Sequence, residues 1–359
     1  MAFLEFKNVK ISGVAAAVPE RIFSNTELRQ GMDFSSDYTP EAFINSTGVK
    51  ERRLGNLTAS DLGYFAAEKL IYDLGWQKQD VEALIFVSQM ADYFLPATAC
   101  ILQDRLGLQK DCYAMDIAMG CSGWVYGLNS AASLISANNI HKVLLIAGDA
   151  KRRAHYDDPL FGHAATATAI EYDENGSGLK FHFGTDGSGF DAIIIPDGGA
   201  RNQITEKSFH FDENDGKLVH RLQPRMKGMD VFAFGITTAP KSIKMLGERF
   251  KFDYLDYDYY LFHQANMKMN NQIVKKLKLS PEKVPSCMFH FGNTSSASIP
   301  LTIVTELSNL VYSKPTKFIC CGFGVGLSWG TVAFETNSLI VSELVEVSDE
   351  NGINNKYVV

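Results

Sequence analysis

The same succession of apolar strands, polar junctions and apolar helices occurs twice along this chain of 359 residues, and few folds accommodate such a repeat. Phe86 lies 35 residues before Cys121, and Phe262 lies 31 residues before Asn293. The pattern predicts strands at 7–17, 81–88, 112–118, 142–147, 256–262, 287–291 and 317–321, with helices between them. Alternating apolar strands and helices predict sheets that are covered by helices on both faces. We therefore predict an α/β fold built from two duplicated halves, residues 1–180 and 181–359.

Composition excludes several classes of function. The hydrophobic content of 46% with 21% charged residues is typical of a globular protein, and the net charge of −7 does not favour nucleic acid as a partner. No apolar run reaches transmembrane length, and residues 1–14 form a strand pattern rather than a signal peptide. The six cysteines have no metal-ligand spacing and suit a reducing compartment. We expect a cytoplasmic protein without a metal site or a membrane contact.

Cys121 is the first candidate for catalysis because it lies where an apolar strand meets an apolar helix. The segment from Asp116 to Trp124 ends the strand in Gly-Cys-Ser-Gly, which places Cys121 at the first turn of the helix. The free N–H groups and the positive dipole end of a helix stabilise a thiolate, the nucleophilic form of cysteine. The alternative is a small core cysteine, because free cysteines are often buried.

Two further polar residues occupy comparable junctions in the second half. His263 follows a predicted buried strand, and Asn293 stands in the Gly-Asn-Thr-Ser segment that opens an apolar helix. A single histidine after a strand is more often a structural residue. However, the junctions of a duplicated α/β fold meet at one crevice, so we expect Cys121, His263 and Asn293 to lie together.

The order cysteine, histidine, asparagine also occurs in papain-like proteases. The 142 residues between Cys121 and His263 are within the range for that class. Gly123 occupies the place of the second cysteine of the protease motif, and Cys121 is far from any mature N-terminus. The protease interpretation is therefore not favoured.

Several segments carry a more specific resemblance. They are Val18-Pro19-Glu20 with Asn25, Thr47 to Arg52, the Cys121 loop, Gly184 to Gly189, His263-Gln264-Ala265-Asn266, Gly292 to Pro300, and Gly322 to Gly330. In this order they resemble the β-ketoacyl-acyl-carrier-protein synthase III family of the thiolase superfamily, along nearly the whole chain. The resemblance implies a thiolase-like five-layered αβαβα fold from two similar halves, and a homodimer.

The resemblance also implies a mechanism. Cys121 would take an acyl group from a thioester donor, and His263 and Asn293 would stabilise the enolate formed when a malonyl thioester loses its carboxylate. The backbone N–H groups of Cys121 and Val325 would form the oxyanion hole, with Gly324 and Gly326 allowing close approach. No cofactor is required, since acyl groups arrive on acyl carrier protein or coenzyme A.

Acyl carrier protein is the expected partner. Lys268, Lys275 and Lys276 match basic positions that the family uses for this partner, and residues 267–281 contain no acidic side chain. A basic face in an acidic chain suits an acidic carrier and its phosphopantetheine phosphate. The alternative is an ordinary solvated helix face.

The chain departs from the family where coenzyme A binds. Ala42 and Ser46 stand where relatives that use coenzyme A carry a tryptophan and an arginine around the adenine. Residues 156–163 lack the arginine that those relatives place near the phosphates, and His163 replaces an aspartate. Leu95 stands where relatives donate a phenylalanine to the acyl pocket of the partner subunit.

These observations favour decarboxylative Claisen condensation with malonyl-acyl carrier protein, in fatty acid or specialised acyl-chain biosynthesis. One alternative is an acyltransferase that passes the acyl group from Cys121 to an alcohol, amine or thiol. Retention of Asn293 argues against it, because simple transfer forms no enolate. The other alternative is a non-catalytic carrier-binding subunit, which the presence of Cys121 and His263 disfavours.

Overall fold

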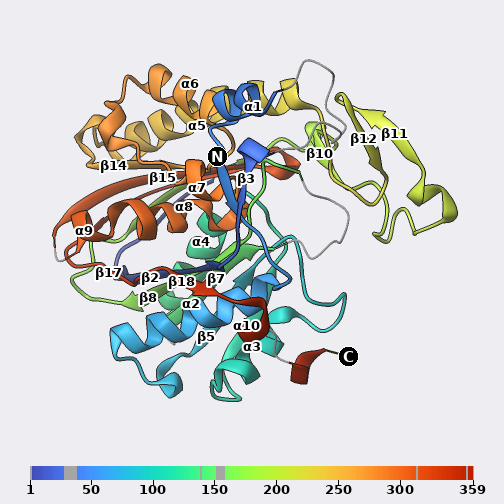
Figure 1. The fold of residues 1–359 in the computed structure, drawn as a ribbon. Helices are drawn as coiled ribbons and strands as arrows, with labels where there is room; N and C mark the ends of the chain where they lie inside the picture. Colours follow the sequence, from blue (N-terminus) through green and yellow to red (C-terminus); the bar gives the residue numbers. More distant parts are fainter. Residues whose placement is uncertain are drawn as a thin grey trace.

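Two β-sheets face each other across a layer of helices, and further helices cover their outer faces (Figure 1). The computed structural model describes residues 2–27, 39–137, 140–150, 158–312, 314–352 and 355–358. From top to bottom, Figure 1 shows helices, a sheet, helices, a second sheet and helices. The predicted five-layered αβαβα fold is confirmed.

The first sheet contains most strands of the N-terminal half. In the described residues its order is β17-β2-β8-β7-β5-β6, and β18 also pairs with β2. The strands are β2 (Val9–Pro19), β5 (Ala83–Val87), β6 (Tyr113–Ile117), β7 (Lys142–Asp149), β8 (Ala164–Tyr172), β17 (Ile340–Val341) and β18 (Val345–Val347). β5 is parallel to β6 and β7, and all its residues are buried, as the continuous apolar run predicts.

The second sheet has the order β1-β9-β16-β15-β14 in the described part of the chain. Its strands are β1 (Ala2–Phe6), β9 (Leu179–Thr185), β14 (Tyr259–Phe262), β15 (Thr316–Gly324) and β16 (Ser328–Thr336). β14 pairs in parallel with β15, and β15 pairs antiparallel with β16. This arrangement matches the pairing of β5, β7 and β8 in the first sheet.

Helices fill the three remaining layers. α4 (Gly123–Ser136) and α8 (Ser298–Thr302) lie between the sheets, α2 (Ala59–Leu74) and α3 (Thr98–Leu106) cover the first sheet, and α5 (Gly228–Phe250) and α6 (Met267–Leu277) cover the second. α2 begins at a capping box formed by Thr58 and Asp61 and ends at Gly75 in the left-handed conformation. These local signals define where the helix begins and ends.

Smaller elements complete the fold. They are β3 (Ile22–Ser24), β4 (Glu51–Arg53), β10 (Ile193–Ile194), β11 (Phe211–Asn214), β12 (Lys217–His220), β13 (Arg225–Met226), α1 (Pro40–Thr47), α7 (Met288–Phe291), α9 (Ser308–Val311) and α10 (Asp349–Gly352). The β11–β12 hairpin projects to the right in Figure 1. Among the described residues, no helix combines the length and the apolar character that a membrane span requires.

The two halves differ in two respects. The first is that β6 has no counterpart in the second sheet, because the segment before Asn293 forms the helical turn α7. The second is that the chain ends cross between the halves: β1 completes the second sheet, and β17 and β18 complete the first. The division that we expect at residue 180 falls within β9.

Candidate active site

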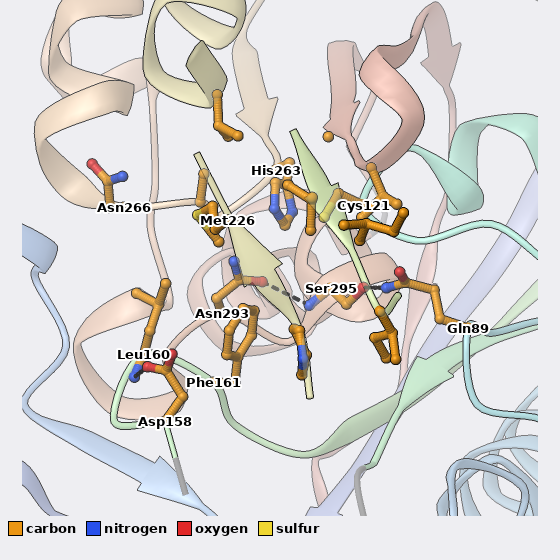
Figure 2. A pocket seen from close by; sticks show the side chains of 18 of the residues that line it. Gln89, Cys121, Asp158, Leu160, Phe161, Met226, His263, Asn266, Asn293 and Ser295 are labelled. Carbon is orange, nitrogen blue, oxygen red and sulfur yellow. Dashed lines mark hydrogen bonds between the residues drawn. The ribbon is translucent and has the colours of Figure 1, made fainter. Parts of the chain in front are cut away.

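A cavity of about 450 Å³ opens where strands of both sheets end, and it collects the residues that the sequence singled out. Cys121, His263 and Asn293 all line it, together with Gly324 and Val325. Figure 2 shows the three side chains facing one space, although they come from separate elements. The expectation that the junctions of the two halves meet at one crevice is therefore met.

Cys121 is half-buried in the loop between β6 and α4. It lies two residues before α4, whose N-cap is Ser122, and so just outside the first turn where the sequence placed it. A β-carbon at Gly324 would lie 2.8 Å from Cys121 Sγ, and one at Gly322 would lie 2.8 Å from the Cys121 carbonyl oxygen. Glycine is needed at both positions, because any side chain there would displace the nucleophile loop.

His263 follows β14 directly and is only 2% exposed. Its Nδ1 lies 2.9 Å from Ser298 Oγ. Burial lowers the pKa of His263 to about 3, and a hydrogen bond with the backbone of Ser295 only partly opposes this shift. The imidazole is therefore neutral at physiological pH, so one nitrogen carries a hydrogen and the other accepts one.

The side-chain amide of Asn293 has a defined orientation. Its Oδ1 accepts the backbone N–H of Ser295 at 2.9 Å, and the side chain is 6% exposed. This bond turns Oδ1 toward the backbone of Ser295, so Nδ2 is the amide atom that can donate into the cavity. Ser295 has a φ of +53°, unusual for a residue other than glycine, and this turn brings its N–H back to Asn293.

Val325 follows the glycine that touches Cys121 and also lines the cavity. Its carbonyl oxygen accepts the Ser328 hydroxyl at 2.9 Å, and the Ser328 hydroxyl lies 2.8 Å from that of Ser122. These two hydrogen bonds link the Val325 backbone to the N-terminal end of the helix that follows Cys121. The peptide expected to supply an oxyanion-hole N–H is therefore held beside the nucleophile.

Several lining residues were missed by the sequence analysis. Gln89 and Met90 follow β5, and the region of β10 to β13 contributes an apolar wall that includes Ile193, Val219 and Met226. Gln89 could have been found, since it follows a buried strand just as His263 does. Residues 197–228 form a polar stretch of the sequence, and no local pattern in it indicates that these residues reach the cavity.

Other predicted residues lie outside the cavity. Leu95 is 87% exposed and does not line it. Lys268 and Lys275 are exposed on α6, while the ammonium group of Lys276 donates to the carbonyl oxygen of Ile236 at 3.0 Å. α6 nevertheless borders the cavity, because Asn266 and Met269 at its start line it.

The structure shows the surroundings of most positions at which this chain differs from relatives that use coenzyme A. Ala42 is exposed on α1, and the Ser46 hydroxyl donates to the carbonyl oxygen of Phe43 at 3.0 Å. His163 is 8% exposed, and its Nδ1 accepts the backbone N–H of Gly55. Residues 156 and 157 of the stretch 156–163 lie outside the described residues.

The remaining cysteines do not share the environment of Cys121. Cys287, Cys320 and Cys321 are buried, and burial raises the pKa of Cys287 and of Cys321 to about 12 and that of Cys320 well above its usual value. Cys112 is half-buried, and its pKa is raised to about 11. Within the described ranges, no group of three acidic, histidine or cysteine side chains could hold a metal ion.

Comparison with known proteins agrees with this geometry. Residues 115–187 match the family model of 3-oxoacyl-[acyl-carrier-protein] synthase III, and residues 248–336 match the model of its C-terminal part. The beta-ketoacyl-[acyl-carrier-protein] synthase III of Clostridioides difficile strain 630 is 32% identical over 327 residues, which cover 89% of this chain and 96% of that protein. The corresponding Clostridium acetobutylicum enzyme is 31% identical, with 91% and 98% covered.

A crystal structure of a 3-oxoacyl-(acyl-carrier protein) synthase from Burkholderia xenovorans LB400 superposes with a TM-score of 0.87 at 34% identity. The match covers 96% of this chain and 99% of that one. Sequence identity over almost the full length and the shared fold lead to the same conclusion. The chain belongs to the β-ketoacyl-acyl-carrier-protein synthase III family.

Proposed function

We propose that this protein is a condensing acyltransferase that joins an acyl group held on Cys121 to a malonyl unit held on acyl carrier protein. The proposal rests on family membership and on the convergence of Cys121, His263 and Asn293 at one cavity. The product is a 3-oxoacyl thioester, which serves fatty acid or specialised acyl-chain biosynthesis.

The first half-reaction is a thioester exchange. The sulfur of Cys121 attacks the donor carbonyl, the carbon–sulfur bond of the donor breaks, and the carrier thiol leaves with the proton. The tetrahedral oxyanion is stabilised by the backbone N–H groups of Cys121 and Val325, whose peptides lie side by side through Gly324. This step needs neither His263 nor Asn293 as an enolate stabiliser.

The second half-reaction forms the carbon–carbon bond. The malonyl thioester loses carbon dioxide, and the electron pair of the broken bond passes into an enolate. Neutral His263 and the amide of Asn293 donate hydrogen bonds to the enolate oxygen. The enolate carbon then attacks the acyl carbonyl, and the sulfur of Cys121 leaves and is reprotonated.

The orientation of the Asn293 amide is the observation that carries this proposal. Because Ser295 N–H occupies Oδ1, the amide offers Nδ2 to the cavity, beside an imidazole that is neutral and can also donate. Two neutral donors suit a transient enolate. Acyl transfer to an alcohol, amine or thiol would need no such pair, so condensation is favoured over that alternative.

The partner is an acyl carrier protein, as the names of the relatives indicate for those enzymes. Lys268 and Lys275 are exposed on α6, whose first turn borders the cavity, so an acidic carrier docked there would reach Cys121 with its phosphopantetheine arm. Lys276 contributes less, since its ammonium group already bonds Ile236.

The protein acts as a homodimer in the cytoplasm. β6 is an edge strand whose residues are exposed or half-buried although it is rich in apolar side chains, and such an edge is suited to pairing with a second copy. The nearby Phe94 and Leu95 are 94% and 87% exposed, and a partner subunit would cover them. Free cysteines, three of them buried, suit a reducing compartment.

The test is a reaction of the purified protein with an acyl thioester and malonyl-acyl carrier protein. We expect a mass increase on Cys121, release of carbon dioxide and a 3-oxoacyl product, all detectable by mass spectrometry. Acylation without malonyl consumption, followed by transfer to an added alcohol or amine, would support the acyltransferase alternative. A protein that is never acylated would support the non-catalytic alternative.

A further inference from the structure

Gln89 occupies a fixed position at the end of β5, beside the nucleophile. Its backbone N–H donates to Asp149 Oδ1 at 2.9 Å, and the Ser88 hydroxyl donates to the same oxygen at 2.9 Å. Asp149 ends the neighbouring strand β7 and is 3% exposed. These hydrogen bonds fix the main chain at Gln89 to the sheet. The position of its side chain is restricted as a result.

The side chain of Gln89 lies against the residue that precedes Cys121. A β-carbon at Gly120 would lie 2.5 Å from Gln89 Nε2 and 2.9 Å from Oε1. Gly120 is the neighbour of Cys121 in the chain, and Gln89 and Cys121 line the same cavity, so an acyl group on Cys121 would share that cavity with the amide. In Figure 2, Asn266 and Gln89 lie on opposite sides of Cys121, so the amide lies across the cavity from the start of α6.

Gln89 and Ser295 form a polar pair in an otherwise largely apolar wall. Gln89 Nε2 donates to Ser295 Oγ at 3.0 Å, and Figure 2 shows this bond next to the one between Ser295 and Asn293. Among the described residues this is the only hydrogen bond of either side chain. The pair therefore keeps one unused acceptor, Gln89 Oε1, and two unused donors, the second N–H of Gln89 Nε2 and the Ser295 hydroxyl hydrogen.

A hydroxyl group is complementary to this pair, because it can donate to Oε1 and accept from the Ser295 hydroxyl. An alkyl chain makes none of these bonds and would exclude water from all three groups. A carboxylate could accept from the two donors, but it has no hydrogen to donate to Oε1, and the oxygens would repel each other. The complementary ligand is therefore an uncharged, hydroxylated acyl chain.

We propose that Gln89 and Ser295 form a subsite that selects acyl donors with a hydroxyl group on the first carbons of the chain, such as 3-hydroxyacyl thioesters. This inference rests on the proposed function, since it names the acyl group that Cys121 receives. The subsite recognises only the acyl part, so the preference is the same whether acyl carrier protein or coenzyme A presents it.

The test compares how fast 3-hydroxybutyryl and butyryl thioesters acylate Cys121, each on both carriers, by intact-protein mass spectrometry. The wild-type protein should react at least tenfold faster with the hydroxylated donor, because a site with polar groups rejects the analogue that lacks the hydroxyl. Gln89→Met, which keeps the length of the side chain but removes the amide, should bring the ratio of the two acylation rates close to one.

Gln79→Met is the matched control, because it makes the same change at an exposed position of the short helix Lys78–Asp80. It should keep the wild-type ratio. A wild-type ratio of one or less, or an unchanged ratio in Gln89→Met, would overturn the inference. Circular dichroism and the thermal unfolding midpoint report correct folding of each variant. Failure of every donor to acylate the wild-type protein would instead overturn the proposed function.

Discussion

Cys121 and Asn293 stand at corresponding junctions of the two halves, yet the chain reaches them in different ways. In the first half the regular strand β6 leads to Cys121, and the 14-residue helix α4 follows. In the second half the helical turn α7 leads to Gly292, and the segment after Asn293 passes through a 3₁₀ turn, α8 and a π-helical stretch at 303–307.

The difference matches the roles that we propose for the two residues. Cys121 is half-buried at the cavity, where an acyl donor can reach its sulfur. Asn293 is 6% exposed, and the turn at Ser295 holds its amide in one orientation. A nucleophile must be accessible, whereas a hydrogen-bond donor for a transient charge must be rigid. The repeated fold provides two equivalent junctions, one for Cys121 and one for Asn293. The irregular backbone around Asn293 distinguishes the second junction from the first.

The largest expected effect is at the accessible junction. Cys121→Ser should abolish formation of the acyl-enzyme, because a serine hydroxyl is a much weaker nucleophile than a cysteine thiol at neutral pH. Intact-mass measurement after incubation with an acyl thioester would report this. Iodoacetamide labelling adds a second readout, in which Cys121 should react faster than the exposed Cys100, and Cys287, Cys320 and Cys321 should react slowest. Equal labelling of wild type and Cys121→Ser would contradict the assignment.

The rigid junction should affect only the second half-reaction. Asn293→Ala and His263→Ala should each reduce malonyl decarboxylation by roughly 100-fold or more, since a lost donor of this kind costs on the order of 3 kcal/mol. Acylation of Cys121 should remain close to the wild-type rate, which serves as the internal control for folding. Condensation at the wild-type rate in Asn293→Ala would favour the acyltransferase alternative.

Burial at the second junction should also appear in the pH dependence of stability. The pKa of His263 is lowered to about 3 in the folded protein, whereas the ordinary value is 6.5. Above about pH 6.5 the imidazole is neutral in both the folded and the unfolded protein. As the pH falls from 6.5 toward 3, only the unfolded chain gains the proton, so the free energy of unfolding decreases. At pH 5 the free energy of unfolding should be lower by about 2 kcal/mol than at pH 7 from this residue alone.

His263→Asn removes that titration and provides the comparison. Urea unfolding at pH 7 and pH 5 should show a smaller loss in the variant than in the wild type. His182, whose pKa is also lowered by burial, remains in both proteins and cancels. The same loss in both proteins would mean that the imidazole of His263 titrates normally in the folded state.

The smallest expected effect is on the choice of acyl donor, and it depends on two helices, α1 from the first half and α6 from the second. Ala42 and Ser46 on α1 offer neither an aromatic face nor a guanidinium group, and such contacts are worth about 1–3 kcal/mol per base. Coenzyme A esters should therefore acylate Cys121 roughly tenfold less efficiently than the same acyl group on acyl carrier protein. The difference should shrink as salt rises, because docking on Lys268 and Lys275 is electrostatic.

A gain-of-function variant tests that prediction directly. Ala42→Trp combined with Ser46→Arg should improve coenzyme A esters while leaving carrier-bound donors unchanged. Equal efficiency of both donor types in the wild-type protein would show that another surface binds the nucleotide.

The repeat and its junctions were predictable because apolar periodicity is a local property of the sequence. β5, β7 and α2 carry continuous apolar runs or clear caps, and the polar residues that follow the strands pointed to Cys121, His263 and Asn293. The cavity wall formed by β10 and β13 was not predictable. Its strands are two residues long, and their pairing across more than 30 residues leaves no periodic signal.

The role of Gln89 in the cavity could not be predicted from the sequence either. Its position after a buried strand is visible in the sequence, but its contacts with Gly120 and Ser295 depend on how the two halves pack. Likewise, nothing local to α7 distinguishes it from the strand that the repeat would place there. Propensity over four residues is too weak to decide between the two.

The exchange of chain ends between the sheets has a consequence for how the protein forms. β1 is made first but pairs with β9, and β2 acquires β17 and β18 only after residues 340–347 have been synthesised. The N-terminal half therefore cannot finish its sheet while the chain is growing, and the two halves must close together. Contacts between residues more than 300 positions apart make that last step slow, and they tie the unfolding of each half to that of the other.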